Sequence, residues 1–326
     1  MKHALLLVFE YNYVCNKLIG AKKDLQMALD LCRHFEIENI TIITDIKDIK
    51  ITDKNIKVKY TQLPNIFFVC REISQFIENT LRGIEDYIFK SAGEVHEVFL
   101  YISCHGGEID INGKIDQGII LTDNINKRYL ISKDLFNLLF GNLIIDINGY
   151  IKIPIWKKVI SNNKVITSFE YIYCQLTSPS SPKSNKKNRS TYLANRGLPS
   201  STKMLIIIDT CHSGAMTSFP YRYKDEKMIF IPNHNIDLFD DLPFCICLSA
   251  CFENEKTISN NNGSVFTSSL YKILLKYKEQ MTIGQLYYIL SKSKYIPILS
   301  STVNNLDMTI PFYTNFYENE IIIINK

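Results

Sequence analysis

Two apolar segments of the sequence are each followed by a residue that can take part in nucleophilic catalysis. Residues 98–103 lead within two positions to His105, which is followed by Gly106. Residues 204–209 lead within two positions to Cys211. An imidazole beside a thiol lowers the pKa of that thiol and yields a reactive thiolate. The two segments therefore predict a cysteine–histidine site, on the condition that the fold brings their ends together.

Glycine follows both candidate residues within three positions, at Gly106 and Gly214. A residue without a Cβ atom lets the backbone approach a substrate closely. We therefore expect the amides of Gly106 and Cys211 to point together at a developing oxyanion. A single histidine at a strand end, or a single cysteine in an apolar run, is more often structural, so it is the pairing of the two patterns that favours catalysis.

Several short apolar runs predict the strands that must position these residues. They are uninterrupted rather than alternating, which is typical of strands buried in a parallel sheet. The expected strands are Ala4–Phe9, Ile40–Thr44, Val98–Ser103, Met204–Asp209 and Phe244–Ser249. Helical spacing of apolar residues appears in Asp24–Phe35, Ile73–Phe89, Asp134–Phe140 and Ser264–Tyr277. Strands that alternate with helices predict an α/β fold, in which helices cover both faces of a parallel sheet and sites form at the carboxyl ends of its strands.

Residues 142–203 break this alternation. The stretch 146–153 predicts a hairpin that turns at Asn148 and Gly149. Residues 177–203 are rich in Ser, Pro, Lys and Asn and offer few apolar side chains to bury, so we expect a mobile loop there. The stretch 320–324 predicts a last strand.

Composition and charge exclude several classes of protein. Of the 326 residues, 46% are hydrophobic and 21% are charged, which is typical of a globular chain and not of a disordered one. The 37 Lys and Arg against 33 Asp and Glu give a net charge of +4, which is too small to indicate nucleic-acid binding. The apolar run at residues 4–9 is too short for a signal peptide or a membrane-spanning helix. We therefore expect neither a nucleic-acid partner nor a membrane.

The cysteines bear on the cellular compartment. There are nine, an odd number, and most lie in apolar runs, which favours reduced thiols over a disulfide framework. Cys245 and Cys247 are closely spaced, but no second pair accompanies them as a zinc site would require. We expect a cytoplasmic protein, and a monomer.

The segments YISCHG (Tyr101–Gly106) and DTCHSG (Asp209–Gly214) resemble the two catalytic blocks of the metacaspases, which belong to the wider caspase-like cysteine peptidases. The family's usual blocks are Ser-Gly-His-Gly and Asp-x-Cys-His-Ser-Gly. The second block matches fully, and the first departs at Cys104. Further resemblance covers the chain at 2–24, 40–45, 248–255 and 263–270.

This resemblance implies a caspase–hemoglobinase fold, a three-layer sandwich with a mostly parallel central sheet and helices on both faces. It also implies a single catalytic domain over residues 1–326. Residues 1–141 and 203–225 would correspond to the family's large subunit, and 226–326 to its small subunit. Residues 142–203 would be an insertion between them.

The resemblance further implies a Cys/His dyad that cleaves proteins after Arg or Lys. Cys211 would attack the scissile carbonyl, and His105 would act as general base and then as acid, with no third member. The neighbouring His212 would serve packing. The acidic pocket that accepts the basic side chain would consist of Asp24, Ser103 and Asp209. Asp24 is equally explained as a carboxylate near a helix N-terminus, where the macrodipole favours it.

Calcium activates many metacaspases, and here the sequence departs most from the family. The positions of the family's calcium ligands fall on Ser132, Lys133 and Ser218. A lysine in place of an oxygen ligand disfavours a hard dication. The stretch 110–116 contains acidic and amide oxygens, but it reads equally well as an exposed turn. We therefore expect no metal and no cofactor.

Basic residues also indicate where the enzyme would process itself. The loop at 177–203 contains Lys183, Lys186, Lys187, Arg189 and Arg196. A second candidate for self-cleavage is Arg222 with Lys224. Two alternatives remain open, a legumain-like peptidase with preference for Asn, and an inactive homologue that acts as a regulatory or binding protein.

Overall fold

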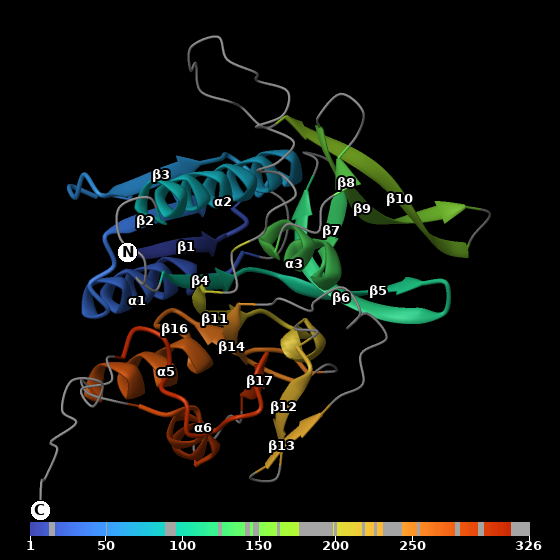
Figure 1. Ribbon diagram of the computed structural model, residues 1–326. Coiled ribbons are helices and arrows are strands. Elements are labelled where there is room, and N and C mark those ends of the chain that lie inside the picture. The colour runs from blue at the N-terminus through green and yellow to red at the C-terminus, as the bar shows by residue number, and fades with distance from the viewer. Residues whose placement is uncertain are drawn as a thin grey trace, which may run out of the picture.

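The structure is a computed structural model of the chain (Figure 1). It describes residues 1–12, 17–49, 51–88, 96–122, 126–140, 144–145, 150–161, 164–175, 198, 201–216, 219–224, 227–230, 243–252, 255–277, 281–292 and 297–313. The predicted last strand at 320–324 and the basic residues of the 177–203 loop lie outside these residues, as does Ser218.

A nine-stranded sheet forms the centre of the protein, in the order β13-β12-β17-β14-β11-β4-β1-β2-β3. Its strands are β1 (Lys2–Val8), β2 (Asn39–Thr44), β3 (Ile56–Tyr60), β4 (Glu97–Ser103), β11 (Lys203–Asp209), β12 (Tyr221–Lys224), β13 (Lys227–Phe230), β14 (Phe244–Ser249) and β17 (Ile298–Ser301). The six strands from β3 to β14 run parallel, and β17, β12 and β13 add an antiparallel edge. All five strands predicted from apolar runs are therefore confirmed, and they are neighbours within the parallel part.

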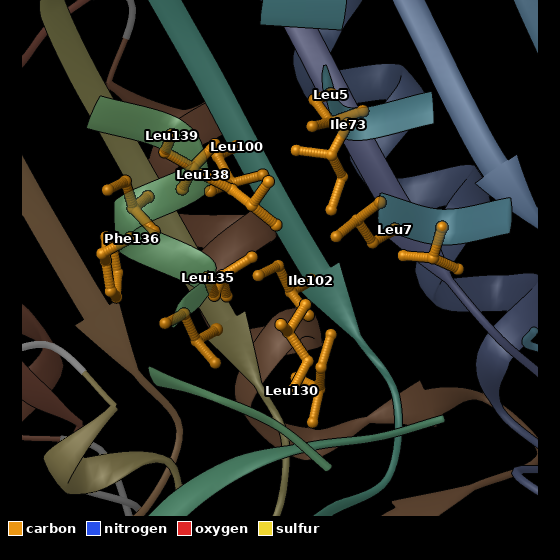
Figure 2. Packing of buried hydrophobic residues seen from close by; sticks show 14 of the residues in the cluster. Leu5, Leu7, Ile73, Leu100, Ile102, Leu130, Leu135, Phe136, Leu138 and Leu139 are labelled. Carbon is orange, nitrogen blue, oxygen red and sulfur yellow. The ribbon is translucent and has the colours of Figure 1, made fainter. Parts of the chain in front are cut away.

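Helices cover both faces of this sheet. They are α1 (Ala21–His34), α5 (Val265–Lys276) and α6 (Ile283–Ser291) on one face, and α2 (Ile66–Ile88) and α3 (Ser132–Phe140) on the other. Successive strand residues point to opposite faces, so Leu6 packs with α1 and α5, whereas Leu5 and Leu7 pack with α2 (Figure 2). The expected α/β sandwich with helices on both faces is confirmed.

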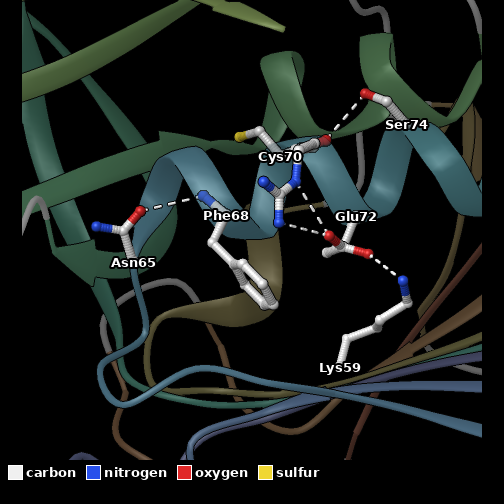
Figure 3. Close-up of polar contacts among 7 residues, drawn as sticks. Lys59, Asn65, Phe68, Cys70, Glu72 and Ser74 are labelled. Carbon is white, nitrogen blue, oxygen red and sulfur yellow. Dashed lines mark hydrogen bonds and ion pairs between the residues drawn. The ribbon is translucent and has the colours of Figure 1, made fainter. Parts of the chain in front are cut away.

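Polar contacts fix helix α2 against the edge of the sheet (Figure 3). Asn65 precedes the helix, and its Oδ1 accepts the backbone N–H of Phe68 at 3.1 Å, which is an N-cap contact. The buried carboxylate of Glu72 forms ion pairs with Lys59 of β3 at 3.0 Å and with Arg71 at 2.8 Å. These two cations neutralise a charge that would otherwise be costly to bury.

A second, antiparallel sheet follows directly from the end of β4. Its order is β10-β9-β7-β6-β5, and a two-residue strand β8 pairs with β9. The strands are β5 (Gly106–Ile111), β6 (Lys114–Thr122), β7 (Lys127–Ile131), β8 (Ile144–Ile145), β9 (Tyr150–Ser161) and β10 (Lys164–Gln175). The predicted hairpin around Asn148 and Gly149 is present as β8–β9, although residues 146–149 themselves lie outside the described chain. The much longer β9–β10 hairpin was not predicted.

The stretch 110–116 forms the turn between β5 and β6. Asn112 and Gly113 both have positive φ, at 56° and 81°, as a two-residue hairpin turn of type I′ requires. The carboxylate of Asp110 accepts the N–H of Gly113 at 2.7 Å, and Asp110 is exposed. The exposed-turn interpretation of this stretch is therefore confirmed.

No helix within the described residues is both long enough and apolar enough to cross a membrane.

Candidate active site

The fold brings the ends of β4 and β11 together. The two strands are parallel neighbours, and Ser103 lies opposite Asp209 in their register. His105 and Cys211 each follow two residues later, so they leave the same edge of the sheet at matching positions. A Cβ atom added to Gly106 would lie 2.0 Å from the carbonyl oxygen of Cys211, which shows that the two backbone segments are in direct contact. The backbone thus brings together the ends of the two apolar segments, as a cysteine–histidine site requires.

A tight turn presents Cys211. The next residue, His212, has a left-handed conformation with φ of 58°, and its N–H donates to the carbonyl of Glu255 at 2.9 Å. Cys211 is partly exposed, and its Sγ lies 3.7 Å from the hydroxyl of Thr257. The Nδ1 atom of His212 lies 3.5 Å from a carboxylate oxygen of Glu108.

The three residues of the expected acidic pocket also converge. Asp24 and Asp209 are 2% and 4% exposed, and Ser103 is buried with them. The hydroxyl of Ser103 donates to Asp24 at 3.2 Å, and the backbone N–H of Ser264 donates to the other oxygen of Asp24 at 2.8 Å. The hydroxyl of Thr267 donates to Asp209. Residues 79 and 240 positions apart in the sequence thus hold one carboxylate beside the strand ends.

Burial and mutual repulsion govern the protonation of these carboxyl groups. Loss of hydration, and then the negative charge of Asp209, raise the pKa of Asp24 to about 7. Burial also raises the pKa of Asp209.

The segment after β14 covers Asp24. It contains the short strands β15 (Ser259–Asn260) and β16 (Gly263–Ser264), which lie against the first turn of α1. Gly263 has a φ of 100°, and a Cβ added there would lie 2.6 Å from Oδ1 of Asp24. A Cβ at Gly20 would lie 2.4 Å from the hydroxyl oxygen of Ser259. Both glycines therefore permit a close approach that places Ser264 on Asp24.

Ser132, one of the three positions that match the family's calcium ligands, begins α3 and donates its hydroxyl to Asp116 at 3.3 Å. Two residues further along, Asp134 accepts the indole N–H of Trp156 at 3.3 Å, and burial raises its pKa to about 7. Across the described ranges, no three His, Cys, Asp or Glu side chains come together as a metal site would need.

Two residues beside the dyad were missed by the sequence reasoning. Tyr11 follows β1, and its ring centroid lies 4.4 Å from that of the His105 imidazole. Thr257 touches the thiol, as described above. The sequence could have indicated Tyr11, because this residue follows a predicted buried strand whose carboxyl end lies at the same edge of the sheet as the ends of β4 and β11. No sequence signal pointed to Thr257.

Comparisons with known proteins bear on the fold. No protein-family model matches the sequence, and no curated protein matches it. The solved structure of protein GSU0716 from Geobacter sulfurreducens aligns over 96% of this chain and 98% of its own, with 14% sequence identity and a TM-score of 0.50. Caspase-1 from Spodoptera frugiperda aligns over 96% and 92%, with 11% identity and a TM-score of 0.44. The Geobacter protein shares the α/β fold of this chain.

The raised pKa of Asp24 leads to a prediction about stability. The folded protein keeps the proton of Asp24 up to a pKa of about 7, whereas the unfolded chain loses it near the ordinary value of 3.8. Between these values the folded state binds more protons, so this group's contribution to stability falls as the pH rises. Asp24→Asn removes the titration, and we expect it to raise the free energy of unfolding by about 4 kcal/mol at pH 8 and by less than half of that at pH 5.

Urea unfolding at both pH values checks this expectation. Asp30→Asn is the matched control, because Asp30 lies on the same helix and is partly exposed. A change in the free energy of unfolding of Asp24→Asn that is equal at pH 5 and pH 8 would contradict the assignment of a raised pKa.

Proposed function

We propose that the protein is a caspase-like cysteine endopeptidase of the metacaspase type that cleaves proteins after Arg or Lys. One observation carries the proposal. The strands β4 and β11 are parallel neighbours whose ends lead to His105 and Cys211, and the buried Asp24 of α1 contacts Ser103, which lies opposite the buried Asp209. A nucleophile, a base and an anionic pocket in one place are what hydrolysis beside a basic residue needs.

Each step of the proposed reaction would be carried out by one of these residues. His105 takes the proton of the Cys211 thiol, and the thiolate attacks the scissile carbonyl carbon. The amides of Gly106 and Cys211 would donate to the resulting oxyanion. The imidazolium of His105 then gives its proton to the leaving amine as the C–N bond breaks. His105 next deprotonates a water molecule, which cleaves the thioester and restores the free thiol.

The pocket residues would select the substrate. In the free protein, Asp24 and Asp209 repel each other, so a bound Arg or Lys gains from both carboxylates. Ser103 would orient Asp24 through its hydroxyl. An acidic substrate side chain would instead add a third negative charge to a buried site and be rejected.

Of the two regions predicted for self-cleavage, the proposal keeps residues 177–203 and drops Arg222 with Lys224. Arg222 lies in β12, where it pairs with β13 and β17 and donates to the carbonyl of Gly214 at 2.8 Å. A peptidase needs an extended backbone that is free to enter the active site, so cleavage at Arg222 or Lys224 does not fit this conformation. The basic residues of the 177–203 loop are the remaining candidates. Intact-mass analysis should show fragments ending at these residues in the wild type and none in Cys211→Ala.

A panel of fluorogenic peptides with Arg, Lys, Asn or Asp at the cleaved bond tests the proposal. We expect hydrolysis of the Arg and Lys peptides alone, unchanged by a metal chelator. Preference for Asn would indicate a legumain-like peptidase instead. Hydrolysis of no peptide would indicate an inactive homologue that acts by binding.

Gly106→Ala tests the contact between the two strand ends. The added methyl group would lie 2.0 Å from the Cys211 carbonyl oxygen, so the cysteine backbone must shift. We expect kcat to fall by about 100-fold or more, because displacement by about 1 Å has such an effect on a catalytic group. Gly113→Ala is the control, since no atom of the described residues would lie within 4 Å of a Cβ there, and it should lose stability from its positive φ but not kcat. Equal kcat values for Gly106→Ala and the wild type would contradict the assignment.

A further inference from the structure

Tyr11 occupies an unusual position at the end of β1. It is 1% exposed and has a left-handed conformation, with φ of 59°, which is uncommon for a bulky residue. Asp45, which follows β2, holds this conformation. One of its carboxylate oxygens accepts the N–H of Tyr11 at 2.8 Å, and the other accepts the N–H of Glu10. The strain in this turn is therefore offset by a buried carboxylate from the next strand.

The hydroxyl of Tyr11 joins two segments of the active site. It accepts the backbone N–H of His105 at 3.2 Å and donates to the carbonyl of Ile120 on β6. The N–H of Ile120 in turn donates to the carbonyl of His105 at 2.8 Å. These three hydrogen bonds enclose the main chain of His105 between β4, which ends at Ser103, and β5, which begins at Gly106.

The ring of Tyr11 also contacts the side chain of His105. The ring centroids are 4.4 Å apart and the planes are tilted by 47°. One residue therefore touches both the main chain and the imidazole of the general base. Burial raises the pKa of Tyr11 well above its ordinary value, so the phenol stays protonated and can keep donating to Ile120.

We propose that Tyr11 is a positioning residue that holds His105 toward Cys211, with Asp45 fixing Tyr11 in turn. The inference rests on the proposed peptidase function, which it deepens. If packing were the only role of the ring, a phenylalanine would serve at position 11, as the buried Phe9 does at its own position. The hydroxyl thus serves the strand junction at His105 and not the packing alone.

Three variants separate positioning from packing. Tyr11→Phe keeps the ring and loses both hydroxyl contacts, and Tyr11→Leu loses the ring as well. Tyr313→Phe is the matched control, because Tyr313 is also buried, and its hydroxyl donates to the carbonyl of Leu274 at 2.9 Å, away from the dyad. Both Phe variants remove one buried phenol, so their losses of thermal stability should be similar.

The experiment measures kcat and KM for an Arg peptide, and the rate at which iodoacetamide alkylates Cys211 at pH 7. For Tyr11→Phe we expect kcat to fall about tenfold with unchanged KM, and for Tyr11→Leu about 100-fold. Alkylation should slow in the same order, since a displaced imidazole no longer promotes the thiolate. Tyr313→Phe should match the wild type in all three quantities.

Two outcomes distinguish failure of this inference from failure of the proposed function. If the wild type hydrolyses no peptide, the function fails, and the alkylation rates alone decide the role of Tyr11. If Tyr11→Phe matches Tyr313→Phe in both kcat and alkylation rate, the positioning role is overturned, even where the peptidase activity stands. A Tyr11→Leu protein that does not fold leaves the comparison of the two Phe variants intact.

Discussion

Cys211→Ala is expected to abolish hydrolysis of Arg and Lys peptides, and His105→Ala to lower kcat by about 1,000-fold. The reason is that the thiol forms the covalent intermediate and the imidazole transfers every proton in the proposed reaction. KM should change little in either variant that retains measurable activity, because neither side chain belongs to the pocket for the basic residue. Steady-state kinetics with an Arg peptide measure both quantities.

His212→Asn is the matched control for the dyad. It removes the imidazole next to Cys211, which faces Glu108, and asparagine tolerates the left-handed conformation at this position. We expect its kcat to stay within about tenfold of the wild type. A loss in His212→Asn as large as that in His105→Ala would mean that the wrong histidine has been assigned.

Asp209→Asn is expected to lower kcat/KM for Arg and Lys peptides by about 100-fold or more, since a buried cation would lose one of its two anionic partners. Asparagine can still accept from Thr267, so the fold of the pocket should survive. Activity toward a peptide with Asn at the cleaved bond should fall much less. The ratio of the two kcat/KM values therefore reports the selectivity of the pocket directly.

Asp134→Asn provides the comparison for the pocket. Asp134 is, like Asp209, a buried carboxyl whose pKa burial raises, in its case to about 7, but its partner is Trp156 on the second sheet. We expect this variant to keep the wild-type preference for Arg. If Asp134→Asn and Asp209→Asn lose kcat/KM equally, the loss reflects stability, and the acidic pocket is not where basic side chains bind.

The parallel core was predictable because its strands are buried on both faces. An uninterrupted run such as Leu205–Ile208 can belong to few other environments than a strand buried on both faces. The strands that were missed lack this signature. Strand β3 (Ile56–Tyr60) lies at the sheet edge and alternates with lysines, and much of β10 is exposed. Their pairing is decided by tertiary contacts, which weak propensities do not reveal.

The site divides in the same way. The placement of His105 and Cys211 followed from a general rule, that parallel strands deliver their carboxyl ends to one edge. Tyr11 contacts His105 across 94 residues, and Thr257 contacts Cys211 across 46. Such contacts depend on how loops pack after the sheet has formed, and no local pattern encodes them. The left-handed conformation of Tyr11 is likewise set by Asp45, a residue from another strand.

Labelling with an arginyl chloromethyl ketone reports together on the thiol of Cys211, the imidazole of His105 and the acidic pocket. The reagent carries a cationic side chain that the acidic pocket would bind, and it alkylates a thiolate that a nearby imidazole promotes. A thioether forms as chloride departs. We expect one label, on Cys211 among the nine cysteines, with much slower labelling in His105→Ala and by the corresponding aspartyl reagent. Labelling of another cysteine, or equal rates with the arginyl and aspartyl reagents, would contradict this expectation.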